Sequence, residues 1–315
     1  MFSKLTRRSF QTLQKAGIMP CHSDELRKAG DHWAEHDRDF STHRHWTEIP
    51  AVAARIREKI SGSSEEDLFG YVVRKYFKAA GRPLRAALSL GCGAGALEIG
   101  LTQYVTLERH DAVDISEGLI KQARENAAAF PYIHYWVDDL NTCSFAPEQY
   151  DLVLAHQSLH HVAELERLFT NVRAAMREHA IFVFDEYVGP RRFQWTDRQF
   201  EIINACLKIL PDWLTLDPET KQPRREIPRV SAKQVATVDP TEAIRSDEIM
   251  AVCQKLFRPL EVRPYGGTVL HMLLHVIAGN FMRPEAEPWL ELLFRIEDSV
   301  LPETGSDFVS VIAST

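Results

Sequence analysis

Residues 88–95 read Leu-Ser-Leu-Gly-Cys-Gly-Ala-Gly, and the fold of this 315-residue chain is predicted from this stretch outward. The apolar start is typical of a buried strand in a parallel sheet. Gly91, Gly93 and Gly95 then predict a tight turn into a helix that begins near 94–97, because glycine reaches backbone conformations that other residues resist. At such a turn the bare backbone can approach a ligand closely. Dinucleotide-binding enzymes use a similar turn, so the glycines alone leave the ligand open.

A second strand, at 111–114, ends in Asp114, which is 19 positions after Gly95. Further apolar strands are predicted at 150–156 and 180–186, and a segment of helical period separates them. Alternating strands and helices predict an α/β fold with a parallel sheet covered on both faces. Ligands of such sheets bind in the crevice beyond the carboxyl ends of the strands.

From about residue 84 to 188 the chain resembles the class I S-adenosylmethionine-dependent methyltransferases. In that family the glycine-rich stretch wraps the methionine part of the cofactor, and an acid after the second strand accepts both ribose hydroxyls. The resemblance therefore implies a cofactor site that contains Gly91, Cys92, Gly93, Gly95, Asp114 and the adjacent Ile115.

The segment Ile133-His-Tyr-Trp-Val-Asp-Asp-Leu-Asn resembles the family's third strand, whose terminal acid contacts the adenine amine. Asp139 is favoured for this role, because it precedes the Tyr150-Asp151 pair by the family's usual spacing, and Asp138 is the alternative. Leu140 belongs to the same cofactor segment. His156, which ends the fourth strand, should line the sulfonium side of the cofactor or pack beneath it.

The resemblance implies a Rossmann-like, seven-stranded, mostly parallel sheet with helices on both faces and an antiparallel last strand, here near 308–313. One departure is the turn before the fifth strand, Arg177-Glu-His-Ala in place of the family's proline-glycine-glycine. Residues 1–80 should form an N-terminal helical extension or lid. The methyltransferase domain should span 81–315, with helical insertions at about 187–245 and 266–303.

Three side chains that follow the fourth and fifth strands are candidates for catalysis: His160, His161 and Glu186. Histidine titrates near neutrality, so it can take a proton from an acceptor. His160 is favoured over His161, although both could instead cap the following helix or bond within the interior. Glu186 could accept a hydrogen bond from the acceptor or form an ion pair with Arg191 or Arg192.

No metal site is expected. His271 and His275 are four residues apart, as in zinc-binding helices, but they lie among apolar residues and should be satisfied in a buried helix. The N-terminal histidines favour a solvated or lid segment. The five cysteines include no C-x-x-C pair, which indicates reduced thiols. In the excursion after the fifth strand, Phe193, Trp195 and Trp213 should pack the lid or wall the acceptor.

Composition limits the partners. A net charge of −7 argues against nucleic acid, whose binding depends on clustered Lys and Arg. No window contains the ~18 apolar residues of a membrane span. Thr6-Arg7-Arg8-Ser9-Phe10 imitates an export signal without the apolar stretch that should follow, so we expect a cytoplasmic location and no membrane partner.

The sequence therefore predicts an enzyme that transfers a methyl group from S-adenosylmethionine to a hydroxyl or amine of a small molecule and releases S-adenosylhomocysteine. A nicotinamide-dependent oxidoreductase shares the glycine turn but does not explain the acids after the third strand. A catalytically idle module that binds S-adenosylhomocysteine is the other alternative. A crevice with room beside the cofactor would favour the enzyme over this module.

Overall fold

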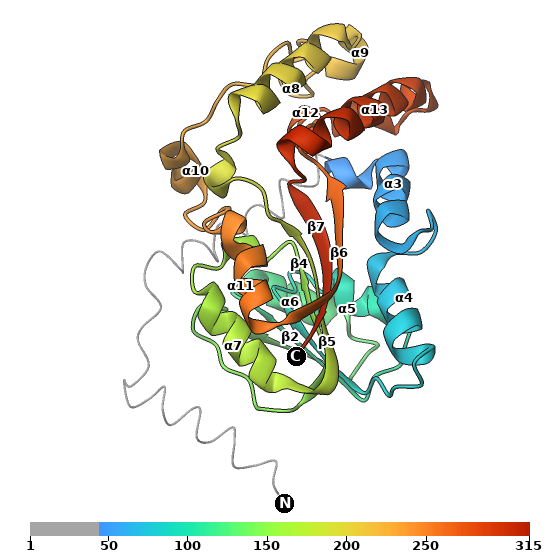
Figure 1. Ribbon diagram of the computed structural model, residues 1–315, viewed down its shortest axis with the longest axis vertical. Helices are drawn as coiled ribbons and strands as arrows, with labels where there is room; N and C mark the ends of the chain where they lie inside the picture. Colours follow the sequence, from blue (N-terminus) through green and yellow to red (C-terminus); the bar gives the residue numbers. More distant parts are fainter. Residues whose placement is uncertain (1–43) are drawn as a thin grey trace, which may run out of the picture.

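A computed structural model describes residues 44–315, which form one seven-stranded sheet flanked by helices (Figure 1). The strand order is β3-β2-β1-β4-β5-β7-β6, and only β7 runs against its neighbours. The predicted fold class and the antiparallel last strand are confirmed. The strands are β1 (Ala86–Leu90), β2 (Arg109–Asp114), β3 (Ile133–Val137), β4 (Tyr150–His156), β5 (Met176–Tyr187), β6 (Arg258–Gly266) and β7 (Phe308–Ser314).

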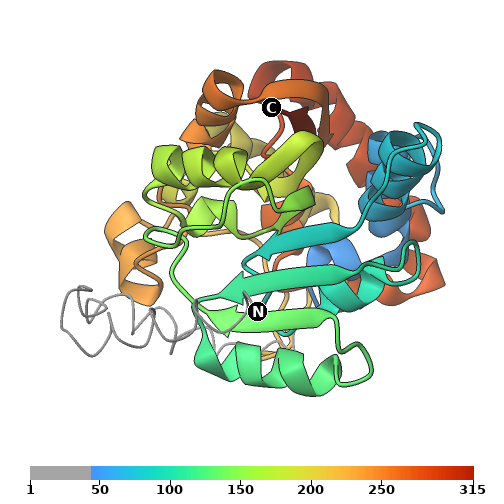
Figure 2. The same cartoon turned by 90° about the horizontal axis from the view of Figure 1, so that it is seen from below.

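Helices connect the strands and cover both faces of the sheet, as the view from below also shows (Figure 2). Within the described residues the longer helices are α3 (Pro50–Ser61), α4 (Leu68–Val72), α5 (Ala96–Leu101), α6 (Glu117–Asn126), α7 (Leu165–Ala175), α8 (Asp197–Ile209), α10 (Ala232–Val238), α11 (Ile249–Leu256), α12 (Leu270–Leu274) and α13 (Glu287–Thr304). The short α9 spans Asp212–Thr215, and a π-helical segment, Val73–Lys78, continues α4. None of these helices is long and apolar enough to cross a bilayer.

Consecutive residues of β4 pack into different cores, because side chains alternate across a strand. Leu152 and Leu154 face the core that α3, α8, α12 and α13 share, whereas Val153 and Ala155 face the core beneath α7 and α11. A third, smaller core lies under α6, around Ile120. All four β4 residues named here are at most 1% exposed, so the central strands are fixed from both sides.

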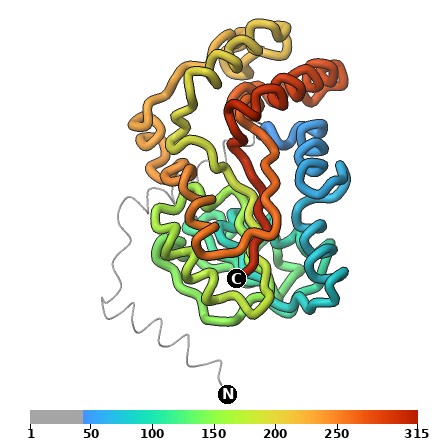
Figure 3. The backbone as a smooth tube through the Cα atoms, in the orientation of Figure 1, coloured from blue at the N-terminus to red at the C-terminus, as the bar shows by residue number. Residues whose placement is uncertain are grey.

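The excursion after β5 rises away from the sheet, runs through α8, α9 and α10, and returns at α11 (Figures 1 and 3). α12 and α13 lie beside α8 at the same end of the molecule. Trp195 ties this region to β7: its indole Nε1 donates a hydrogen bond of 2.8 Å to the buried Asp307.

The structure corrects one boundary. The expected turn at 177–180 is part of β5, which pairs with β4 from Met176 onward through a register shift, and His179 has a φ of 65° there. The helix after the glycine turn begins at Ala96, within the predicted 94–97, and Gly95 is its left-handed N-cap. Residues 1–43, with the export-like segment and His32, His36 and His43, lie outside the described part of the chain.

Candidate active site

A cavity of about 340 Å³ lies beyond the ends of β1 and β4, where the strand order reverses direction. The predicted cofactor residues that line it are Gly91, Cys92, Gly93, Asp114, Ile115, Asp139, Leu140 and His156. Gly95 and Asp138 are not among its lining residues. The volume falls in the usual range of small-molecule sites.

The three glycines of the turn have left-handed φ values, but each is needed for a different reason. A Cβ on Gly91 would lie 2.4 Å from that of Ser158, and one on Gly95 would lie 2.7 Å from the Tyr135 hydroxyl. A Cβ on Gly93 would meet nothing within 4 Å. Gly91 and Gly95 therefore serve packing, whereas the space over Gly93 is open to a ligand.

Asp114 accepts hydrogen bonds of 2.9 Å from the backbone N–H groups of Gly93 and Ser116. Burial raises its pKa, and these two N–H groups offset part of that rise. The carboxylate thus holds the turn in place at the rim of the cavity. It is also positioned to accept hydroxyls of a bound ligand.

Asp139 has one oxygen engaged and one without a partner. Oδ1 accepts from the backbone N–H and the side-chain amide of Asn141, at 2.9 and 2.8 Å. Oδ2 is buried and has no hydrogen-bond partner in the described structure. An unpaired buried carboxylate oxygen is costly, so an amine donor from a ligand would stabilise it. This fits the adenine contact that the sequence assigns to Asp139 and favours it over Asp138.

His156 reaches the cavity from the end of β4, with a side chain that is 48% exposed. Its Nδ1 lies 3.3 Å from Asp185 Oδ2, and Asp185 Oδ1 accepts a hydrogen bond from the Tyr265 hydroxyl. The surrounding protein disfavours the charged imidazole, but Asp185 outweighs this effect and raises the pKa of His156.

His160 and Glu186 form a buried pair. His160 Nδ1 lies 2.6 Å from Glu186 Oε2, and the backbone N–H groups of Ser158 and Leu159 donate to Oε1 of the same carboxylate. Burial opposes the imidazolium, but Glu186 and nearby carboxylates raise the pKa of His160 above its ordinary value. The alternative ion pair is wrong: Arg191 binds Asp247 and Glu248, and Arg192 binds backbone carbonyls.

A loop of the excursion, 239–242, closes over the two histidines, and the sequence analysis missed it. Thr241 lines the cavity and its hydroxyl lies 3.1 Å from His161 Nδ1. Glu242 Oε1 lies 3.7 Å from His160 Nε2. The guanidinium of Arg192 donates to the carbonyls of Pro240 and Glu242, which fixes the path of the loop.

Of the aromatic residues of the excursion, Phe193 and Trp195 pack the interior and Trp213 has neither predicted role. Trp195 is 7% exposed and stacks on Phe193 with 5.0 Å between ring centroids, which is core packing. Trp213 is 38% exposed and does not line the cavity. His271 is not fully satisfied, contrary to expectation, because its Nδ1 is buried without a partner among the described residues.

The chain is similar to known proteins in the sequence of its central segment and in its fold. Residues 88–184 match the methyltransferase domain family. The fold is similar to that of geranyl diphosphate C-methyltransferase from Streptomyces coelicolor, in complex with Mg²⁺, geranyl diphosphate and S-adenosylhomocysteine. That likeness has a TM-score of 0.51 and 13% identity, and covers 94% of this chain and 99% of the other. Phosphoethanolamine N-methyltransferase 2 from Haemonchus contortus gives a TM-score of 0.49 at 14% identity, covering 85% of this chain and 58% of that one.

Among curated proteins, the non-reducing polyketide synthase ausA of Penicillium brasilianum is 26% identical over 135 residues. The match covers 39% of this chain and only 5% of that protein's length. The family match agrees with the resemblance to class I S-adenosylmethionine-dependent methyltransferases over residues 88–184, and the likeness to the Streptomyces coelicolor enzyme shows the same fold. The S-adenosylmethionine cofactor that the sequence predicts agrees with the methyltransferase-domain match.

Proposed function

We propose that this chain, whose residues 88–184 match the methyltransferase domain family, transfers the methyl group of S-adenosylmethionine to a small acceptor that arrives protonated. The observation that carries the proposal is the buried His160–Glu186 pair, which lies beside the cavity that Gly93, Asp114 and Asp139 line. His160 and Glu186 are not among the lining residues of that cavity, but Ser158, two positions before His160, and His161, directly after it, line it.

Different residues of the cavity fit different parts of S-adenosylmethionine. The open space over Gly93 accepts the methionine portion, and Asp114 accepts the ribose hydroxyls. Asp139 Oδ2 accepts the adenine amine. When bound, the sulfonium supplies the methyl group and the leaving group of an in-line displacement, so the protein mainly has to position the acceptor.

His160 removes the acceptor's proton. The Nδ1–H of the imidazole donates a hydrogen bond to Glu186, so Nε2 carries the lone pair that takes the acceptor's proton, and Glu186 stabilises the imidazolium that forms. Carboxylates and thiolates need no such base. The pair therefore favours a hydroxyl, an amine or an acidic C–H group as the acceptor. The partial match to a polyketide synthase supports including phenols and β-dicarbonyl compounds.

The test is methyl transfer from S-adenosylmethionine labelled with tritium in the methyl group, with a panel of phenols, amines and β-dicarbonyl compounds. Label in an extractable product that depends on both protein and acceptor supports the proposal. Tight binding of S-adenosylhomocysteine with no transfer to any acceptor class would favour the idle module. Tight binding of NADH without S-adenosylhomocysteine binding would favour the oxidoreductase.

A further inference from the structure

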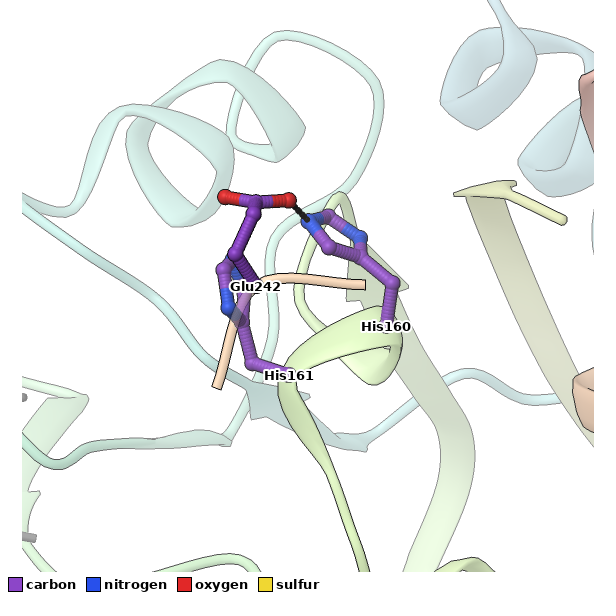
Figure 4. Close-up of side chains that lie close together, drawn as sticks. All are labelled: His160, His161 and Glu242. Carbon is purple, nitrogen blue, oxygen red and sulfur yellow. Dashed lines mark ion pairs between the residues drawn. The ribbon is translucent and has the colours of Figure 1, made fainter. Parts of the chain in front are cut away.

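Two histidines and a glutamate gather at the edge of the cavity from distant parts of the chain. His160 and His161 lie in a short helical turn, Leu159–His161, and Glu242 comes from the loop that returns over them (Figure 4). Donor atoms of the three side chains all lie within 4.8 Å of one another, and the two imidazole rings are 4.2 Å apart between centroids. The side chains of His160, His161 and Glu242 are 9%, 17% and 20% exposed.

Each imidazole is also oriented by oxygen atoms on its Nδ1 side. Glu186 holds His160 Nδ1 at 2.6 Å. His161 Nδ1 faces the Thr241 hydroxyl at 3.1 Å and Asp239 Oδ2 at 3.6 Å. Histidines that bind metals almost always donate their other ring N–H to a carboxylate, carbonyl or water, which fixes the tautomer and the ring orientation. The two histidines already have this support.

Buried carboxylates surround His160 and His161 and favour a bound cation. Glu186 and Asp239 are 0% and 4% exposed, and Asp239 Oδ2 is buried with no hydrogen-bond partner in the described structure. Arg192 binds backbone carbonyls of the loop and leaves the carboxylate oxygens to other partners. The described contacts compensate the negative charge of Glu186, Asp239 and Glu242 only in part, so a bound divalent cation would stabilise these carboxylates.

We propose that His160 Nε2, His161 and Glu242 bind one divalent transition-metal ion. Two imidazoles and one carboxylate suit Zn²⁺ and Co²⁺, whereas Mg²⁺ prefers an all-oxygen shell. Glu242 has to move slightly toward the histidines, because 3.7 Å from its oxygen to His160 Nε2 exceeds the separation of two ligands at about 2 Å from a zinc ion in tetrahedral geometry. Three protein ligands leave a position open toward the cavity that His161 and Thr241 line.

This site revises the expectation that the chain holds no metal site. No ligand spacing in the sequence predicts this site, since Glu242 is far from the histidine pair along the chain. The proposed function assigns the role of base to the same His160 Nε2. A cation on His160 Nε2 takes the lone pair that the base needs, so cation binding and methyl transfer should exclude each other.

The direct experiment is calorimetric titration of the full, metal-free chain with Co²⁺, Zn²⁺ or Mg²⁺ alone, together with the visible absorption of the Co²⁺ form. We expect one Co²⁺ or Zn²⁺ to bind per chain, and Mg²⁺ to bind much more weakly. The Co²⁺ form should show the intense visible absorption of a low-coordinate Co²⁺ centre. Glu242→Gln should weaken Co²⁺ and Zn²⁺ binding at least tenfold. Glu226→Gln, an exposed glutamate of the same excursion, should bind as the unaltered chain does.

His161→Asn provides a second variant if Glu242→Gln fails to fold, and S-adenosylhomocysteine binding checks the fold of each. Absence of Co²⁺ and Zn²⁺ binding would overturn the site. So would binding that Glu242→Gln and His161→Asn leave unchanged, which would assign the metal to histidines elsewhere in the chain. Added Zn²⁺ should inhibit transfer to any acceptor active in the tritium assay. A rise in turnover instead would contradict the base role of His160 and leave the metal site standing.

Discussion

Glu186 Oε2 lies 2.6 Å from His160 Nδ1, while Oε1 of the same side chain accepts the backbone N–H groups that precede the histidine. One fully buried carboxylate at the end of β5 therefore fixes both the turn after β4 and the imidazole on that turn. Such charge-assisted hydrogen bonds are stronger than neutral ones. The geometry links two strand ends that the sequence could place only separately.

Gly93→Ala should abolish tight S-adenosylhomocysteine binding, with a loss of stability no larger than the cost of its left-handed backbone. Its Cβ meets no protein atom within 4 Å and would enter the space assigned to the cofactor, at a cost of about 1–2 kcal/mol for the left-handed backbone. Calorimetry with S-adenosylhomocysteine and thermal unfolding would measure the two effects.

Gly91→Ala provides the contrast, because its Cβ would lie 2.4 Å from the Cβ of Ser158. This variant should lose more stability than Gly93→Ala. If Gly93→Ala binds the cofactor as well as the unaltered chain, the glycine loop is only a turn.

Asp114→Ala should weaken S-adenosylhomocysteine binding by roughly 1.5–3 kcal/mol, since a carboxylate that accepts ribose hydroxyls makes charge-assisted hydrogen bonds. That corresponds to about ten- to a hundredfold in Kd. The variant also loses the anchor of the Gly93 and Ser116 N–H groups, so its melting temperature should fall as well. Unchanged affinity in a folded variant would remove Asp114 from the cofactor site.

Glu98 makes the stability of the protein depend on pH. It is fully buried beneath the glycine loop, and neither carboxylate oxygen has a hydrogen-bond partner within residues 44–315. Burial raises its pKa to about 7, and the nearby Ser89 and Tyr135 hydroxyls offset only part of that rise. The folded state therefore keeps a proton that the unfolded chain releases near its ordinary value of 4.5.

As a result, the contribution of Glu98 to stability is greatest below the unfolded pKa and is lost as the pH rises through about 7. Glu98→Gln should remove this dependence. Relative to the unaltered chain, the variant should gain roughly 2–3 kcal/mol between pH 5 and pH 8. Urea unfolding of both proteins at several pH values measures the difference. A difference that does not vary with pH would show that Glu98 ionises normally.

The sequence predicted the features that depend on local order along the chain. Glycines, acids and histidines at the ends of parallel strands meet at one edge of the sheet, so Gly93, Asp114 and Asp139 could be placed at a common cavity from motifs alone. It could not predict Glu242 beside His160, because that contact depends on how a long excursion folds back, with Arg192 fixing the loop.

Glu98 was missed for a different physical reason. A glutamate in the first turn of a helix usually faces solvent, where it favours the positive end of the helix dipole. Here α5 is short and packs directly under the turn, so the side chain enters the interior beside Tyr135. The helical period of a sequence predicts the side of the helix on which a residue lies. It does not predict how deeply a short helix is buried.

His160→Ala tests the chemistry itself. If His160 removes the acceptor's proton, the substitution should lower turnover about 10²–10⁴-fold near neutral pH and leave S-adenosylhomocysteine affinity nearly intact. The loss should shrink as the pH rises toward the acceptor's own pKa, because the acceptor then ionises without help. His161→Ala is the matched control, since its ring lies beside that of His160 but its Nδ1 faces Thr241 and Asp239. Initial rates against pH with tritium-labelled S-adenosylmethionine, in buffer with EDTA, separate the outcomes. A His160→Ala protein with a lower melting temperature and a small rate loss that does not vary with pH would make the histidine structural, and Glu186 would then serve only to hold the turn after β4.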